Sequence, residues 1–184
     1  GKEFVDGAVE KNLSLDVAIR HGADLVLAIN PIVPLFNIPE NGLHLPGRKR
    51  GKISDRGLPY VLDQVLRIML HARLVFGVEV TKQQNPGVDI LLFEPARNDT
   101  RMFFYNIMRF SVRVLMAWHG FTTTFRRIME NFSYYREVFA RHGIEISDRV
   151  AAAEYRKMST SRFSLECAIR TLEAKPLAIP FPSL

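Results

Sequence analysis

Two short apolar runs in the first 30 residues predict two strands that flank one helix. The first run, Phe4-Val5, ends at Asp6-Gly7, a pair that favours a tight turn. The second run, residues 25–29, is apolar throughout. Such continuous runs are typical of strands buried on both faces, as in a parallel sheet with helices on either side.

The segment between these runs carries helix start and stop signals. Ser14 is placed to cap a helix that continues to about His21. Gly22 follows at the position where a left-handed residue commonly ends a helix.

The middle of the chain changes character twice. Residues 31–57 contain four prolines and read as a long loop, a feature that is usually functional in a compact domain. A helix is expected from Leu58 to about Phe76, with Pro59 in its first turn, and a buried strand is expected over 87–95.

The remainder of the chain reads as helical. Helices are expected at about 100–119, 121–141, 147–157 and 161–173. Gly120 and Gly143 are interpreted as breaks between them, and the proline-rich end as extended.

Composition narrows the class of protein. With 184 residues, 47% hydrophobic and 24% charged, the chain is long enough to bury a globular core and is not of disordered type. A single cysteine, Cys167, excludes an internal disulfide framework and a cysteine-based zinc site. The five histidines show no metal-ligand spacing, and each is expected near a helix end or in a loop, so no metal site is predicted.

The pair Asp6-Gly7 is the strongest candidate for chemistry. It places a carboxylate on a sharp turn at the carboxyl end of a strand, the edge where open α/β sheets collect catalytic groups. Considered alone, the same pair is most simply a structural turn.

A longer string around this pair resembles a known family. Asp6-Gly7-Ala8, then Asn12, then a helix and Gly22-Ala23-Asp24 before a strand, is similar to the catalytic-aspartate segment of the patatin-like phospholipases. The match covers some 25 to 30 residues closely. Ser14 stands where that family usually has proline, a change that preserves the turn because serine can cap the helix.

The resemblance implies an α/β fold: residues 1–95 as the second half of a three-layer α/β/α sandwich, and 96–184 as a helical cap or extension. It further implies hydrolysis of lipid acyl esters by a serine–aspartate dyad with no cofactor. Asp6 would act directly as general base, Gly7 and Ala8 would leave room for the nucleophile and substrate, and Asn12 would be structural.

The nucleophile that the resemblance requires is absent from these residues. None of the nine serines lies in Gly-x-Ser-x-Gly, the nucleophile motif of the family. We therefore expect the serine to come from a segment or chain that precedes Gly1, and the 184 residues alone to be inactive.

Charge suggests the partners. The net charge is +6, and 18 of the 25 cations are arginine, with a basic cluster at Arg48-Lys49-Arg50-Gly51-Lys52. This cluster is interpreted as solvated surface or as a site for an anionic membrane, and nucleic acid is not expected because no aromatic residues are interleaved with it. A cytoplasmic or peripheral-membrane location is favoured.

The alternative function is a non-catalytic module that docks on a membrane or protein through an arginine-rich helical surface.

Overall fold

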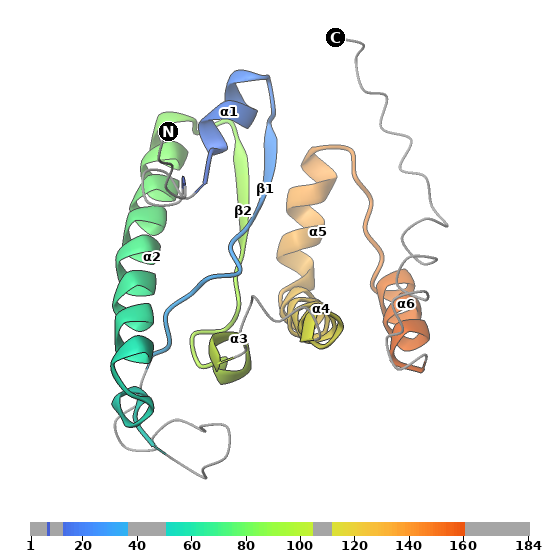
Figure 1. Ribbon diagram of the computed structural model, residues 1–184. Helices are drawn as coiled ribbons and strands as arrows, with labels where there is room; N and C mark the ends of the chain where they lie inside the picture. The colour runs from blue at the N-terminus through green and yellow to red at the C-terminus, as the bar shows by residue number, and fades with distance from the viewer. Residues whose placement is uncertain (1–6, 8–12, 37–50, 105–111, 161–184) are drawn as a thin grey trace, which may run out of the picture. The chain divides into compact units, whose positions relative to one another are not determined.

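The computed structural model of the protein describes residues 7, 13–36, 51–104 and 112–160, and these form two compact units (Figure 1). The first unit comprises the described residues up to 104 together with Arg141–Gly143. The second comprises those within 112–140 and 144–160. The sequence suggested a different division, at residue 95, between a patatin-like α/β core and a helical extension. That division stays a prediction.

The first unit begins with helix α1 (Leu15–Arg20), which ends as expected at Gly22. Gly22 has φ +87°, and its N–H donates to the Ile19 carbonyl at 2.9 Å while the Ala23 N–H donates to the Ala18 carbonyl at 3.1 Å. This is the Schellman pattern, which satisfies the last carbonyls of a helix.

Ser14 occupies the N-cap position of α1, but its hydroxyl makes no capping hydrogen bond. The expectation that this side chain caps the helix is therefore wrong. The Ser14 backbone carbonyl instead accepts from the Val17 N–H at 3.1 Å. The helix is anchored by Leu15, which is buried in the core, so packing replaces the missing cap.

Strands β1 (Leu25–Ile29) and β2 (Asp89–Phe93) pair in parallel, with Leu25 opposite Asp89 and Ile29 opposite Phe93. The fold is therefore mixed α/β, as expected, and the part of the chain that the structure describes contains this one two-stranded sheet. One face of β1 buries Val26 and Ala28.

The opposite face of β1 departs from the expectation of burial on both sides. Leu27 is 52% exposed and Ile29 is 71% exposed. The continuous apolar run therefore predicted the strand correctly. The expectation that both faces of the strand are covered is wrong.

Helix α2 (Leu58–Gln84) lies along the covered face and extends eight residues beyond the expected end near Phe76. Gly77 does not end the helix, because Val78 beyond it is buried in the core. That core joins α2 to both strands and α1; its buried members are Leu15, Val26, Ala28, Leu74, Val78 and Ile90.

Two short elements complete the first unit. A 3₁₀ turn, η2 (Ile53–Arg56), precedes α2, and helix α3 (Thr100–Phe104) follows β2. Phe103 and Leu35 form a second buried cluster, against which Ile53 packs.

The second unit contains α4 (Arg113–Glu130), α5 (Phe132–Arg141), whose last residue belongs to the first unit, and α6 (Asp148–Thr160). The expected break at Gly120 is wrong: α4 continues through it to Glu130. The expected break at Gly143 is confirmed, with φ +69° between α5 and α6. The helix expected over 161–173 and the extended tail lie outside the described residues.

Aromatic packing explains why Gly120 does not interrupt α4. Trp118 and Phe121, on either side of it, stack on Tyr155 of α6 with ring centroids 6.0 and 5.9 Å apart. Phe125, one turn further, stacks on the same ring at 4.4 Å. These contacts hold a continuous helix and outweigh the cost of one glycine, about 1 kcal/mol.

Among the described helices, none is both long and apolar enough to cross a bilayer.

Candidate functional site

Polar side chains gather where the two parallel strands end. Asn30 directly follows β1, and Glu94 directly follows β2. The Asn30 N–H donates to the Phe93 carbonyl at 2.9 Å, which continues the ladder by one residue. The Asn30 side-chain amide donates to Glu94 Oε1 at 2.8 Å, so the two side chains meet at the carboxyl edge of the sheet.

A third group reaches this edge from α2. His71 Nε2 lies 3.2 Å from the same Glu94 oxygen. Asn30 is 3% exposed and His71 is 8% exposed, so both polar side chains are withdrawn from water. We call Asn30, His71 and Glu94 the carboxyl-edge cluster.

The cluster holds a largely buried carboxylate between an amide and an imidazole. Burying a carboxylate is costly unless its oxygens are hydrogen-bonded, and here one oxygen meets two partners. None of the three side chains carries a hydroxyl, so the cluster does not contain the serine that a serine–aspartate dyad requires. It can orient the neighbouring backbone and join the ends of the two strands.

The segment after β1 is fixed against this cluster. Asn30 Oδ1 accepts from the Ile32 N–H at 3.2 Å, which turns the chain. Further on, Gln64 of α2 binds both backbone groups of Leu35, accepting from its N–H at 3.0 Å and donating to its carbonyl at 2.7 Å. The chain that leaves β1 is therefore held in place beside the carboxyl edge.

A buried arginine lies one turn of α2 before His71. Arg67 is paired with Asp63 at 2.8 Å, and its guanidinium stacks over the Phe103 ring at 4.7 Å. These two contacts compensate for removing the guanidinium from water. Arg67 extends the polar inner side of α2 beyond the cluster.

The opposite, amino-terminal edge of the sheet carries a charge cluster of a different kind. Asp89, at the start of β2, binds Arg141 Nη2 at 2.8 Å and His142 Nε2 at 2.7 Å. The hydrogen bond from Arg141, followed by that from His142, holds the pKa of the Asp89 carboxyl below its ordinary value. His142 also lies 3.5 Å from Asp24, which makes this cluster a clamp that fixes residues 141–143 to the strands.

The structure describes only one of the motif residues that the sequence indicated. Asp6, Ala8 and Asn12 lie outside the described residues. Gly7 is described; it is exposed, with open space where a Cβ would project. The placement of the motif beside the carboxyl-edge cluster therefore stays a prediction.

The expectation that every histidine lies near a helix end or in a loop is wrong for two of the five. His71 and His119 lie inside α2 and α4, whereas His21 and His142 follow helix ends as expected. His44 lies outside the described residues. In the part of the chain that is described, no three metal-ligating side chains are grouped as a metal site would need.

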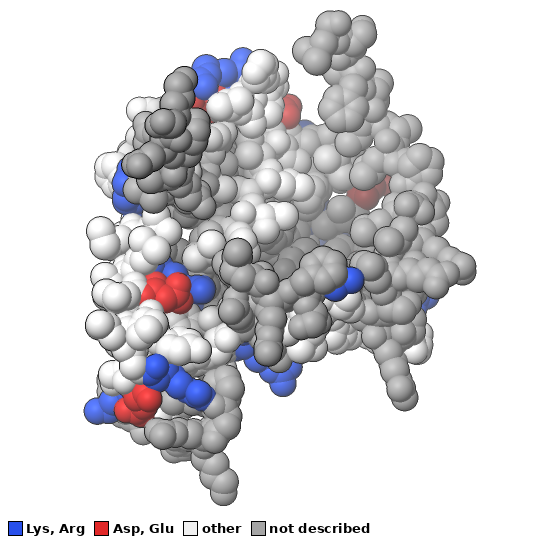
Figure 2. All heavy atoms as spheres, viewed as in Figure 1, with Lys and Arg blue, Asp and Glu red and all other residues white. Residues whose placement is uncertain are grey.

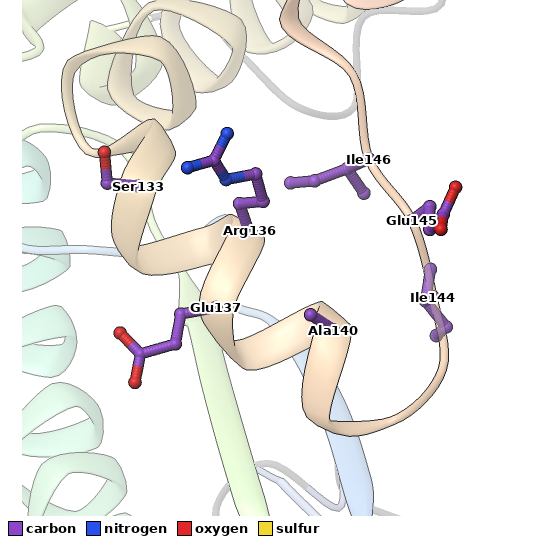
Figure 3. Close-up of a pocket in the computed structure, with 7 residues that line it drawn as sticks. All are labelled: Ser133, Arg136, Glu137, Ala140, Ile144, Glu145 and Ile146. Atoms are coloured by element: carbon purple, nitrogen blue, oxygen red, sulfur yellow. The ribbon is translucent and has the colours of Figure 1, made fainter.

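The second unit has a hollow of about 620 Å³ along α5 (Figure 3). In Figure 3, Ile146 points toward Arg136 of α5, whose guanidinium turns away from Ile146, and Glu145 points away from the hollow. It is lined by Ser133, Arg136, Glu137, Ala140, Ile144, Glu145 and Ile146. Its lining therefore includes no member of the carboxyl-edge cluster.

Comparison of the chain with protein-family models, with curated proteins and with solved structures gave no match. The resemblance of the Asp6-Gly7-Ala8 segment to the patatin-like phospholipases therefore stays a prediction.

The sequence could have identified two members of the carboxyl-edge cluster. Asn30 follows the predicted strand 25–29, Glu94 lies near the end of the predicted strand 87–95, and parallel strands end at one edge. His71 had no such signal, because it is surrounded by apolar residues in the sequence and its inward direction depends on how α2 packs.

Proposed function

We propose that this chain is the carboxyl-terminal part of a patatin-like lipid acyl hydrolase in which Asp6 is the general base. The observation that carries the proposal is the buried carboxyl-edge cluster at the ends of two parallel strands. In open α/β folds this edge is where catalytic groups collect.

Topology supports placing Asp6 at that edge. The motif precedes α1, and α1 leads directly into β1. A strand formed by Phe4-Val5 would then be joined to β1 by a helical crossover, which makes the two strands parallel. Asp6 would follow the end of its strand just as Asn30 follows β1.

The proposed reaction needs a serine from a segment that precedes Gly1. Asp6 would accept the proton of the serine hydroxyl while the oxygen attacks the acyl carbonyl, and the freed alcohol would leave with that proton. Water, deprotonated by Asp6, would then attack the acyl-serine ester, and the serine oxygen would leave with that proton, which frees the fatty acid and regenerates the serine. No metal or cofactor takes part.

Two features of the chain would assist this chemistry. Gly7 leaves open space beside the aspartate for serine and substrate to approach. The carboxyl-edge cluster would form a rigid floor, because Asn30 and Glu94 tie the ends of adjacent strands together.

Ester hydrolysis tests the assignment. The chain joined to the segment that our proposal places before Gly1 should hydrolyse phosphatidylcholine or a short-chain nitrophenyl ester, and Asp6→Asn should lower kcat by about 10²-fold or more. Asp16→Asn is the matched control, because Asp16 forms a surface ion pair with Arg20 of the same helix, and it should retain activity. Equal activity in Asp6→Asn and Asp16→Asn would overturn the role of Asp6.

A further inference from the structure

Helix α2 presents an apolar stripe on the side that faces away from the core. Its members are separated by four, three, four, three and four positions, so they share one helix face. They are Leu58, Leu62, Val65, Met69, Ala72 and Phe76, all of them exposed. We call these six residues the outer stripe, and Phe76 at its end is 71% exposed.

Much of the polarity of α2 is inverted over this length, although Leu74 on the inner face is buried in the core. Its inner face buries Arg67 and His71 and directs Gln64 onto the backbone of Leu35, while leucine and valine side chains face outward. A surface helix ordinarily has the reverse arrangement. Exposed apolar patches of this extent mark surfaces that bind a partner or a membrane.

The apolar surface extends beyond the stripe itself. Leu66, Ile68 and Val75 flank it and are also exposed, so the surface is wider than the narrow seam of two paired helices. In Figure 2 uncharged side chains dominate the surface over α2, at the left. A broad apolar face suits insertion along the plane of a lipid interface.

Charge around the stripe matches an anionic surface. Between Leu58 and Val78 the only acidic residue in the sequence is Asp63, which is paired with the inner-face Arg67. The chain shortly before α2 carries the cluster 48–52 with four cations, and Arg73 flanks the stripe. Cations beside an apolar helix face are attracted to acidic lipid headgroups.

We propose that the outer stripe of α2 docks this protein on the surface of an anionic bilayer, with the apolar side chains in the headgroup and acyl boundary. The occupant is lipid, and the surface does not depend on Asp6 or on any hydrolytic activity. It therefore stands or falls separately from the proposed function.

Two valines provide a matched pair for the test. Val65 in the outer stripe is 46% exposed, and Val150 on α6 of the second unit is 47% exposed. Val65→Glu and Val150→Glu make the same chemical change and the same change in net charge. Vesicles of equal parts phosphatidylglycerol and phosphatidylcholine are sedimented with each purified protein.

Wild type and Val150→Glu should bind these vesicles, and Val65→Glu should lower the partition coefficient about tenfold or more. Met69→Gln alters no charge, and it should also weaken binding. Weaker binding by this variant would show that the apolar contact contributes to binding. Circular dichroism and the unfolding midpoint establish that each variant is folded.

Absence of wild-type binding, or equal binding by Val65→Glu and Val150→Glu, would overturn the proposal. So would a wild-type dimer in sedimentation velocity that Val65→Glu dissociates while vesicle binding is unchanged. That result would assign the stripe to a second copy of the chain.

Discussion

Glu94 holds two buried side chains with a single carboxylate oxygen, Oε1. Glu94→Ala would leave Asn30 and His71 buried without this partner, so we expect the free energy of unfolding to fall by about 1–3 kcal/mol. Urea denaturation measures the change.

Glu79→Ala is the control for that substitution. Glu79 is an exposed residue of α2 and makes a 3.8 Å ion pair with Lys82, so its loss should change stability by about 0.5 kcal/mol or less. Equal effects of Glu94→Ala and Glu79→Ala would contradict the burial of the carboxyl-edge cluster.

Because the pKa of Asp89 is lowered in the folded protein, we expect the free energy of unfolding to decrease in acid. The folded pKa of Asp89 lies below the ordinary value of 3.8, so the charged carboxylate stabilises the fold above that pH. The contribution is lost as the pH falls below about 3.8 through the folded pKa, when Arg141 and His142 lose a charged partner.

The pH series compares wild type with Asp89→Asn. The stability advantage of wild type should be present at about pH 5 and should shrink toward about pH 2.5. An advantage that stays constant over this range would show that ionisation of Asp89 does not support the clamp.

At the residue scale, the sequence predicts where a side chain lies along an element, but not whether that side chain faces the core. Asn30 and Glu94 could be placed at a sheet edge from the strand runs alone. The burial of His71 could not, because it depends on which side of α2 packs on β1 and β2, and apolar residues lie on both sides of this helix.

At the scale of elements, the end of α1 makes a sharp prediction. Gly22 has φ +87°, a region in which any side chain is strained. Gly22→Ala should therefore destabilise the fold by about 1 kcal/mol, and this is measured as a lower urea midpoint.

Gly77→Ala should have the opposite sign. Gly77 lies inside α2, and a Cβ added there would meet nothing within 4 Å, so alanine should stabilise the helix by about 0.5–1 kcal/mol. A loss of stability in Gly77→Ala as large as that in Gly22→Ala would contradict the distinction between the two glycines.

Elements were predictable where the signal is local. Both strands were expected within two residues of their ends, as was the start of α2, because apolar runs and Pro59 act over a few residues. The continuation of α4 through Gly120 was not, since stacking of Trp118 and Phe121 on Tyr155 joins residues far apart in sequence.

At the scale of the whole molecule, the first unit combines a buried polar cluster with exposed apolar surface. Leu27 and Ile29 on the sheet and the outer stripe on α2 are all exposed. We assign the stripe to a lipid surface and expect the open sheet face to be covered by the segment that brings the serine. The sequence indicated a basic cluster shortly before α2, but not that apolar residues of α2 face outward.

The central claim is that Asp6 activates a serine supplied from outside these residues. A fluorophosphonate probe applied to the chain joined to its preceding segment should label one serine, located by mass spectrometry within Gly-x-Ser-x-Gly, and Asp6→Asn should slow labelling while Asp16→Asn should not. A preceding segment without that motif, or labelling at the same rate in Asp6→Asn, would contradict the claim.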